Sequence, residues 1–186
     1  QHWLGRPMST TNNNEYFDGT IAYIRFWHGE ALDADQVAEL YALRIDPTPA
    51  PTPVPTLVPT LVPTPEPTLL PTPAPTILRD PDHEFDFRGC SDSSATADTG
   101  VEGTNITATA TNGATCSSEG MVFDGSDDYV DVTPWPFGGE AMTVEAYVKY
   151  DSFNHWSRII DFGDGENADN VFLANRQTTG TSGWGI

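Results

Sequence analysis

Basic residues are scarce in this chain. Its 186 residues hold 8 Lys and Arg against 27 Asp and Glu, the formal net charge is −19, and Lys149 is the sole lysine. So few cations cannot form a basic patch for a nucleic-acid backbone or an anionic membrane surface. No apolar run approaches the roughly twenty residues that a membrane-spanning helix needs. We therefore expect no nucleic-acid partner and no membrane span within this sequence.

Motifs for catalysis are also missing. The four histidines are scattered, without the spacing of a zinc site. No nucleophile elbow of the G-x-S-x-G type and no phosphate-binding glycine loop occur. Asp127 and Asp131 alternate along the chain, as a glycosidase pair could, but spacing alone only permits this role. We therefore expect that the protein is not an enzyme.

Most prolines lie in one segment. Twelve of the sixteen fall between Pro47 and Pro75, largely in alternation with Thr. Because proline fixes φ and lacks a backbone donor, we expect a disordered linker of polyproline II character over residues 47–78. At about 3.1 Å per residue it could hold its flanks on the order of 90 Å apart. A plain linker, a glycosylated stalk and a ligand for a proline-binding domain are the three alternatives.

The two cysteines, Cys90 and Cys116, both follow the linker. A disulfide between them would close a loop of about 27 residues and stabilise the fold by about 3.5 kcal/mol in the chain-entropy model. Two unpaired thiols are the alternative. Asn105, in Asn-Ile-Thr within the same loop, is an acceptor for N-glycosylation. With the Thr-Pro segment, these features favour an extracellular protein, secreted or at the cell surface.

Short strands are predicted on both sides of the linker. Before it, residues 20–27 are rich in β-branched and aromatic types, with Ala22, Ile24 and Phe26 on one face. After it, the predicted strands are 84–88, 121–123, 129–132, 142–150, 158–162 and 170–174. Short strands joined by Gly, Asp and Asn turns indicate an all-β, antiparallel sandwich.

One short helix is predicted between the first strand and the linker. Asp33 can act as its N-cap, and Gln36, three positions on, can be the reciprocal partner. The helix must end before the prolines, because the residue before a proline is disfavoured in the helical region.

Several stretches resemble the laminin-G-like family, whose domains are concanavalin A-like jelly rolls. Residues 120–132, GMVFDGSDDYVDV, followed by residues 142–153, MTVEAYVKYDSF, are similar to the front half of such a domain. Residues 85–94, FDFRGCSDSS, are similar to its first strand and turn. Residues 16–41, YFDGTIAYIRFWHGEALDADQVAELY, are similar to its closing strand and terminal helix.

The resemblance implies partial domains. Residues 1–46 would be the C-terminal part of one laminin-G-like domain, 47–78 the linker, and 79–186 the N-terminal part of the next. We expect an internal fragment of a longer tandem protein, since the chain starts at Gln and stops without a turn or cap. The first and last strands of such sandwiches are neighbours. One hypothesis is therefore that tail and head pair with each other in permuted order, with the linker looped out.

Acidic residues gather in two predicted loops. Laminin-G-like domains often bind one calcium ion at the rim of the sandwich, and calcium takes roughly six to eight oxygen ligands. The resemblance implies such a site, for which the candidate ligands are Asp124, Asp127, Asp128 and Asp131. A second, weaker group is Asp161, Asp164, Glu166, Asn167 and Asp169. The alternative is that these turns are acidic for conformational reasons and only solvated.

The expected function is that of an extracellular binding or adhesion module for glycans or extracellular proteins, with calcium as a possible cofactor. Five aromatic residues could stack on sugar rings, although such side chains are more often core: Tyr129, Trp135, Phe153, Trp156 and Trp184. Two other hypotheses are a non-catalytic accessory region of a secreted carbohydrate-active enzyme and a structural cell-wall or matrix protein.

Overall fold

Among the described residues, the regular secondary structure is almost entirely β-strand. The computed structural model describes residues 1–9, 15–43, 78–91, 95–137, 139–163, 169–175 and 182–185. Within these ranges it has twelve strands and one helix, in agreement with the predicted all-β sandwich. The chain divides into two units, one of Gln1–Leu32 with Asp80–Ile186 and one of Asp33–Arg79. In the described part, no helix has the length and apolar character needed to cross a membrane.

Seven strands form the first sheet, in the order β12-β11-β10-β1-β8-β5-β4. Their bounds are β1 His2–Leu4, β4 Thr96–Ala97, β5 Thr107–Thr111, β8 Tyr129–Val132, β10 Arg158–Phe162, β11 Val171–Asn175 and β12 Ser182–Gly185. All neighbours run antiparallel. Leu4 of β1 lies opposite both Val130 of β8 and Ile160 of β10. The start of the chain therefore lies in the middle of a sheet whose other strands all follow the linker.

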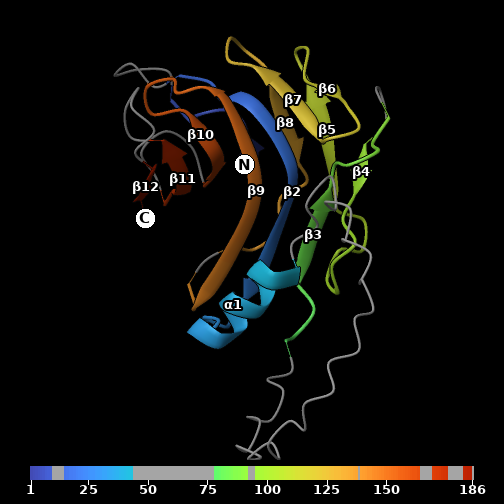
Figure 1. Ribbon diagram of the computed structural model, residues 1–186, viewed down its shortest axis with the longest axis vertical. Coiled ribbons are helices and arrows are strands. Elements are labelled where there is room, and N and C mark those ends of the chain that lie inside the picture. Colours follow the sequence, from blue (N-terminus) through green and yellow to red (C-terminus); the bar gives the residue numbers. More distant parts are fainter. Residues whose placement is uncertain are drawn as a thin grey trace, which may run out of the picture. The chain divides into compact units, whose positions relative to one another are not determined.

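The second sheet has five strands and is built around β2. Its members are β2 Asp18–His28, β3 His83–Asp86, β6 Thr115–Cys116, β7 Met121–Asp124 and β9 Met142–Ser152. The long strand β9 runs along one edge of β2, and β3 and β7 pair with the other edge in succession (Figure 1). Strands from the two sides of the linker thus pair directly with each other.

The hydrophobic core is shared by both sides of the linker. The fully or almost fully buried side chains that precede it are Leu4, Phe17, Ile21, Ile24 and Phe26. Those that follow it include Phe85, Phe123, Val130, Ile160 and Phe162. Burying a large apolar side chain contributes roughly 1.5–3 kcal/mol. Neither side of the linker can therefore complete this core alone.

A β-bulge in β2 changes which side chains face the core. The register between β2 and β9 shifts between Ile21 and Tyr23, so Ala22 is the extra residue. A bulge breaks the strict alternation of side chains. Ile21 therefore joins Ile24 and Phe26 in the core cluster, to which Ala22 does not belong. The prediction that Ala22 shares the face of Ile24 and Phe26 is wrong for this reason.

The opposite face of β2 is tied to its neighbours by polar and aromatic contacts. Arg25 Nε donates to Glu84 Oε1 on β3 at 2.6 Å, and Arg25 Nη1 donates to Glu145 Oε2 on β9 at 3.3 Å. Tyr23 stacks on Tyr147 with ring centroids 5.7 Å apart. Burial, with the carboxylate of Glu145 beside it, raises the pKa of Tyr23 to about 12. These contacts reinforce the pairing of β2 with strands from beyond the linker.

The helix α1, Ala34–Leu43, begins at the predicted cap. Asp33 Oδ1 accepts the backbone N–H groups of Asp35 and Gln36, both at 2.9 Å, and Gln36 Oε1 accepts the N–H of Asp33 at 2.9 Å. This reciprocal arrangement confirms the predicted capping box. The predicted linker, apart from residue 78, lies outside the described residues.

The predicted disulfide is present. Cys90 and Cys116 are bonded, with Cα atoms 5.6 Å apart, and both pack against the edge of the core. Between them, Asn105 is exposed in the turn before β5 with a φ of 64°. Asn is one of the few residue types that tolerate this left-handed conformation. The sequon therefore lies at an accessible turn.

Candidate functional site

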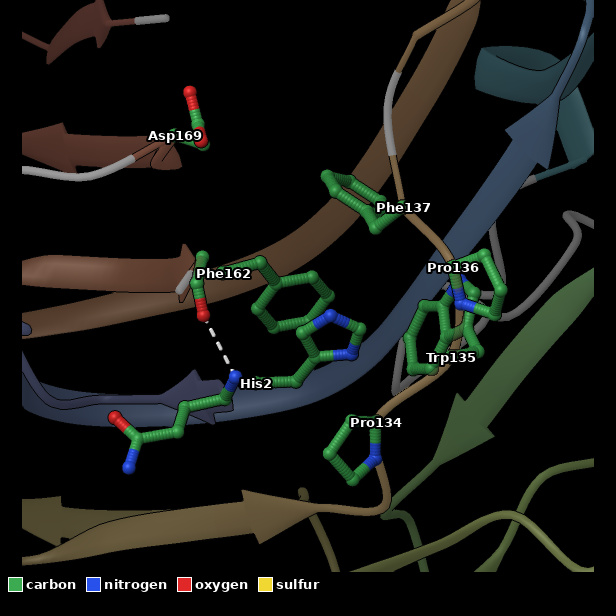
Figure 2. Close-up of a pocket in the computed structure, with 9 residues that line it drawn as sticks. His2, Pro134, Trp135, Pro136, Phe137, Phe162 and Asp169 are labelled. Atoms are coloured by element: carbon green, nitrogen blue, oxygen red, sulfur yellow. Dashed lines mark hydrogen bonds between the residues drawn. The ribbon is translucent and has the colours of Figure 1, made fainter. Parts of the chain in front are cut away.

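A pocket of about 290 Å³ opens beside the beginning of the chain. It lies among three segments: the first two residues, the stretch that follows β8, and the end of β10 with the residues beyond it. Its lining is formed by Gln1, His2, Pro134, Trp135, Pro136, Phe137, Phe162, Gly163 and Asp169 (Figure 2). Three segments that are distant in the sequence thus form one concave surface.

Four of the nine residues that line the pocket carry aromatic rings: His2, Trp135, Phe137 and Phe162. His2 lies opposite Phe162 in the β1–β10 pair, a position that brings side chains on one face into contact. Their rings stack with centroids 4.3 Å apart. Trp135 meets His2 edge-on at 4.5 Å, and Phe137 meets Phe162 at 5.0 Å. Figure 2 shows these four rings grouped together, with Asp169 apart from them.

Trp135 is held from behind by a buried histidine. The ring of His83 lies 4.1 Å from the Trp135 ring, centroid to centroid. His83 Nδ1 is 2.6 Å from Asp98 Oδ2, and both side chains are almost fully buried. Asp98 Oδ1 also accepts the backbone N–H groups of Glu84 and Gly100. A fixed carboxylate orients the imidazole, so the tryptophan that forms the wall has a rigid support.

His2 is neutral in this environment. Burial lowers the pKa of His2 to about 4, because the charged imidazolium would lose its hydration. Within the described residues, its Nδ1 atom is buried and has no hydrogen-bond partner. A pocket-lining residue thus keeps hydrogen-bonding capacity that the protein itself does not use. Rings on the wall and polar groups from Gln1 and Asp169 suit a ligand with both apolar faces and hydroxyl groups.

Three of the four predicted calcium ligands come together in the turn between β7 and β8. The nearest carboxylate oxygens of Asp124, Asp127 and Asp128 all lie within 4.8 Å of one another. Asp128 is buried and accepts the N–H of Asp124 at 2.9 Å, whereas Asp124 and Asp127 are exposed. Burial raises the pKa of Asp128, and the neighbouring carboxylates add to this shift. A bound cation would relieve both effects, so this donor set fits a hard ion such as calcium.

Asp131, the fourth predicted ligand, lies outside this group. It stands on β8, exposed, opposite Trp3 of β1 and Thr109 of β5. In the second acidic group, Asp161 is buried, where it accepts Arg158 Nε at 3.3 Å and the N–H of Met8 at 2.8 Å. Asp169 lines the pocket instead. Residues 164, 166 and 167 lie outside the described residues.

Of the five aromatic residues suggested for sugar stacking, Trp135 is the one in the pocket. Tyr129 packs against Trp3 beneath Arg6, and Phe153 packs on Tyr150 with 41% of its surface exposed. Trp156 is half-buried, and the side chain of Trp184 lies outside the described residues. The residues that the sequence did not suggest are His2, Phe137 and Phe162. No local pattern marks them, because only the pairing of β1 with β10 brings them together.

Comparison with known proteins finds no match for this chain. No family model matches the chain, and neither does any curated protein or any solved structure. The arrangement of the side chains is therefore what bears on function.

Proposed function

We propose that this chain is an extracellular binding module, a jelly roll of laminin-G-like type that recognises glycans and is not an enzyme. The observation that supports this function is the ring-lined pocket around Trp135. A sugar ring has C–H faces that pack on aromatic rings and hydroxyl groups that bond to polar side chains. The pocket offers both. Its ligand is a neutral saccharide, since the net charge of −19 would repel an anionic one.

Two further features support an extracellular location. The disulfide Cys90–Cys116 is of a kind that persists in oxidising compartments. The exposed turn at Asn105 can accept an N-linked glycan. The same binding role would serve an accessory region of a secreted carbohydrate-active enzyme.

Replacing Trp135 tests the glycan site. We expect the wild-type protein to bind members of an array of neutral oligosaccharides, and Trp135→Ala to weaken the best of them at least about tenfold, a loss of about 1.4 kcal/mol. The loss follows from removal of a stacking surface. Isothermal titration calorimetry measures it, and near-UV circular dichroism shows whether the fold is retained.

Phe153→Ala is the matched control, because it removes an aromatic ring that does not line the pocket. It should leave the affinity unchanged, and Trp135→Phe should retain part of it. Failure of the wild type to bind any neutral oligosaccharide would contradict the proposed function. Equal affinities of Trp135→Ala and wild type would place the glycan site elsewhere.

Calcium is the proposed cofactor, and the turn between β7 and β8 is its proposed site. Ligand binding to the native state stabilises it by about 2.7 kcal/mol at a concentration one hundred times Kd. We therefore expect excess calcium to raise Tm by several degrees relative to a chelator. Asp127→Asn should reduce this shift, because it removes an exposed carboxylate from the three-aspartate group. Asp131→Asn should keep it. A Tm that is the same with calcium and with the chelator would mean that the turn binds no calcium and is only solvated.

A further inference from the structure

The segment that joins β2 to β3 is far longer than their geometry requires. The N–H of His28 donates to Asp82 Oδ2 at 2.6 Å, although the two residues are 54 positions apart in the sequence. The N–H of Asp82 in turn donates to the carbonyl of Phe26 at 2.9 Å. β2 and β3 are antiparallel neighbours, which a loop of about two to five residues can join. We call residues 33–79 the connector.

Residues 1–32, the N-terminal segment, are held in the sandwich mainly by non-covalent contacts. Their strands take two internal positions: β1 between β8 and β10, and β2 between β9 and the β3 and β7 pair. The disulfide joins Cys90 to Cys116 and so lies wholly in the part that follows the connector. The chain has no other cysteine. The connector is therefore the one covalent tie between the N-terminal segment and residues 80–186.

We propose that the N-terminal segment is exchanged between copies of this chain. The partner is a second copy, whose residues 80–186 accept β1 and β2 in the same register as in the single chain. Every hydrogen bond and core contact within the sandwich is then kept, since each is merely made between two chains. Exchange in pairs closes a dimer, and exchange in sequence gives an open chain of sandwiches.

The connector has the reach that exchange demands. A domain of this size has a radius of gyration of about 14 Å. The proline-rich part of the connector, if extended, spans on the order of 90 Å. Proline lacks a backbone donor, so this part does not compete with β2 for its place in the sheet. Two sandwiches can therefore lie side by side while the connectors cross between them.

The balance between the single chain and the exchanged dimer depends on the effective concentration of the chain's own N-terminal segment. A tether holds its end at an effective concentration on the order of 1 mM. Below this concentration each chain prefers its own segment. Exchange becomes favoured when chains are crowded, or when a chain's own segment is defective.

Two double variants, each expected not to fold alone, test the exchange directly. Ile24→Asp with Phe26→Asp puts charges at buried positions of the N-terminal segment, and Phe85→Asp with Phe123→Asp does so in its acceptor. Each double variant alone should lack a cooperative melt. Refolded together under oxidising conditions, at roughly 50 µM each and so well below the effective concentration, they should form one sandwich from two chains. The mixture then shows about half the wild-type near-UV signal and a mass of two chains by light scattering. A mixture that stays unfolded overturns the proposal.

The wild-type chain provides a second, independent measurement. Refolding at about 1 mM should give more dimer than refolding at about 10 µM, because the higher concentration reaches the effective concentration of the chain's own segment and the lower one is about a hundredfold below it. A matched chain, with residues 33–79 replaced by a short glycine-serine turn, should be monomeric at both. If either double variant still folds alone, the comparison of the wild-type chain with this matched chain tests the exchange instead. Equal dimer fractions in the two chains would assign association to another surface and overturn the exchange.

Discussion

Replacing Phe26 by alanine is expected to lower the free energy of unfolding by about 3–5 kcal/mol. The ring is 2% exposed and packs on three other rings, those of Trp135, Phe137 and Phe162, at centroid distances of 5.4–5.8 Å. It therefore joins β2 to segments that follow the linker. A domain of this size is usually stable by about 5–15 kcal/mol, so the variant would be close to unfolding.

Urea denaturation of Phe26→Ala and wild type measures this difference. Phe153→Ala removes the same group from a position that is 41% exposed, and should change the free energy by less than about 1 kcal/mol. If Phe26→Ala were as mild as this control, the N-terminal segment could not be packed into the core that residues 80–186 form. The conclusion that both sides of the linker share one core would then be wrong.

Loss of the disulfide is the second large effect. Removing the Cys90–Cys116 bond by Cys90→Ser with Cys116→Ser should destabilise the fold by about 3.5 kcal/mol, because the unfolded chain regains the entropy of a 26-residue separation. The bond also fastens the segment after β3 to β6, at the end of the second sheet. Thermal melts with and without a reductant give the effect on the wild type.

The double serine variant is its own control for the reductant. Its Tm should already be low and should not move when the reductant is added. A wild-type Tm that is likewise unaffected would show that the bond does not constrain the unfolded chain as the entropy model requires.

Strands with a strong side-chain pattern were predictable from the sequence. Residues 129–132 and 158–162 have the predicted bounds, and β9 begins at Met142 as predicted. β1 is three residues long, too short for any periodicity to appear. β5 has the sequence TATAT, in which Ala108 is fully buried but is too small to produce an apolar signal. The bulge at Ala22 could not be predicted either, since it depends on the register with β9.

The two candidate sites also differ in how far they could be predicted from the sequence. The turn with Asp124, Asp127 and Asp128 is local, so the sequence could place three acidic side chains together. The pocket is not local: His2 and Phe162 meet only because β1 lies beside β10. Trp135 could be named as an aromatic residue, but its neighbours depend on the tertiary structure. Sequence patterns predict sites within one turn far better than sites that strand pairing assembles.

The close approach of His28 and Asp82 also bears on how this chain can change over evolutionary time. Insertions and deletions within the connector leave the strand pairing of both sheets unchanged, because the two ends of the gap are fixed by their own hydrogen bonds. Each doubling of an inserted length costs only about 0.6 kcal/mol in loop entropy. Repeats of the Pro-Thr type can therefore expand or contract by recombination without selection against misfolding. Relatives of this chain should differ most in length at this position and least in the strands on either side of it.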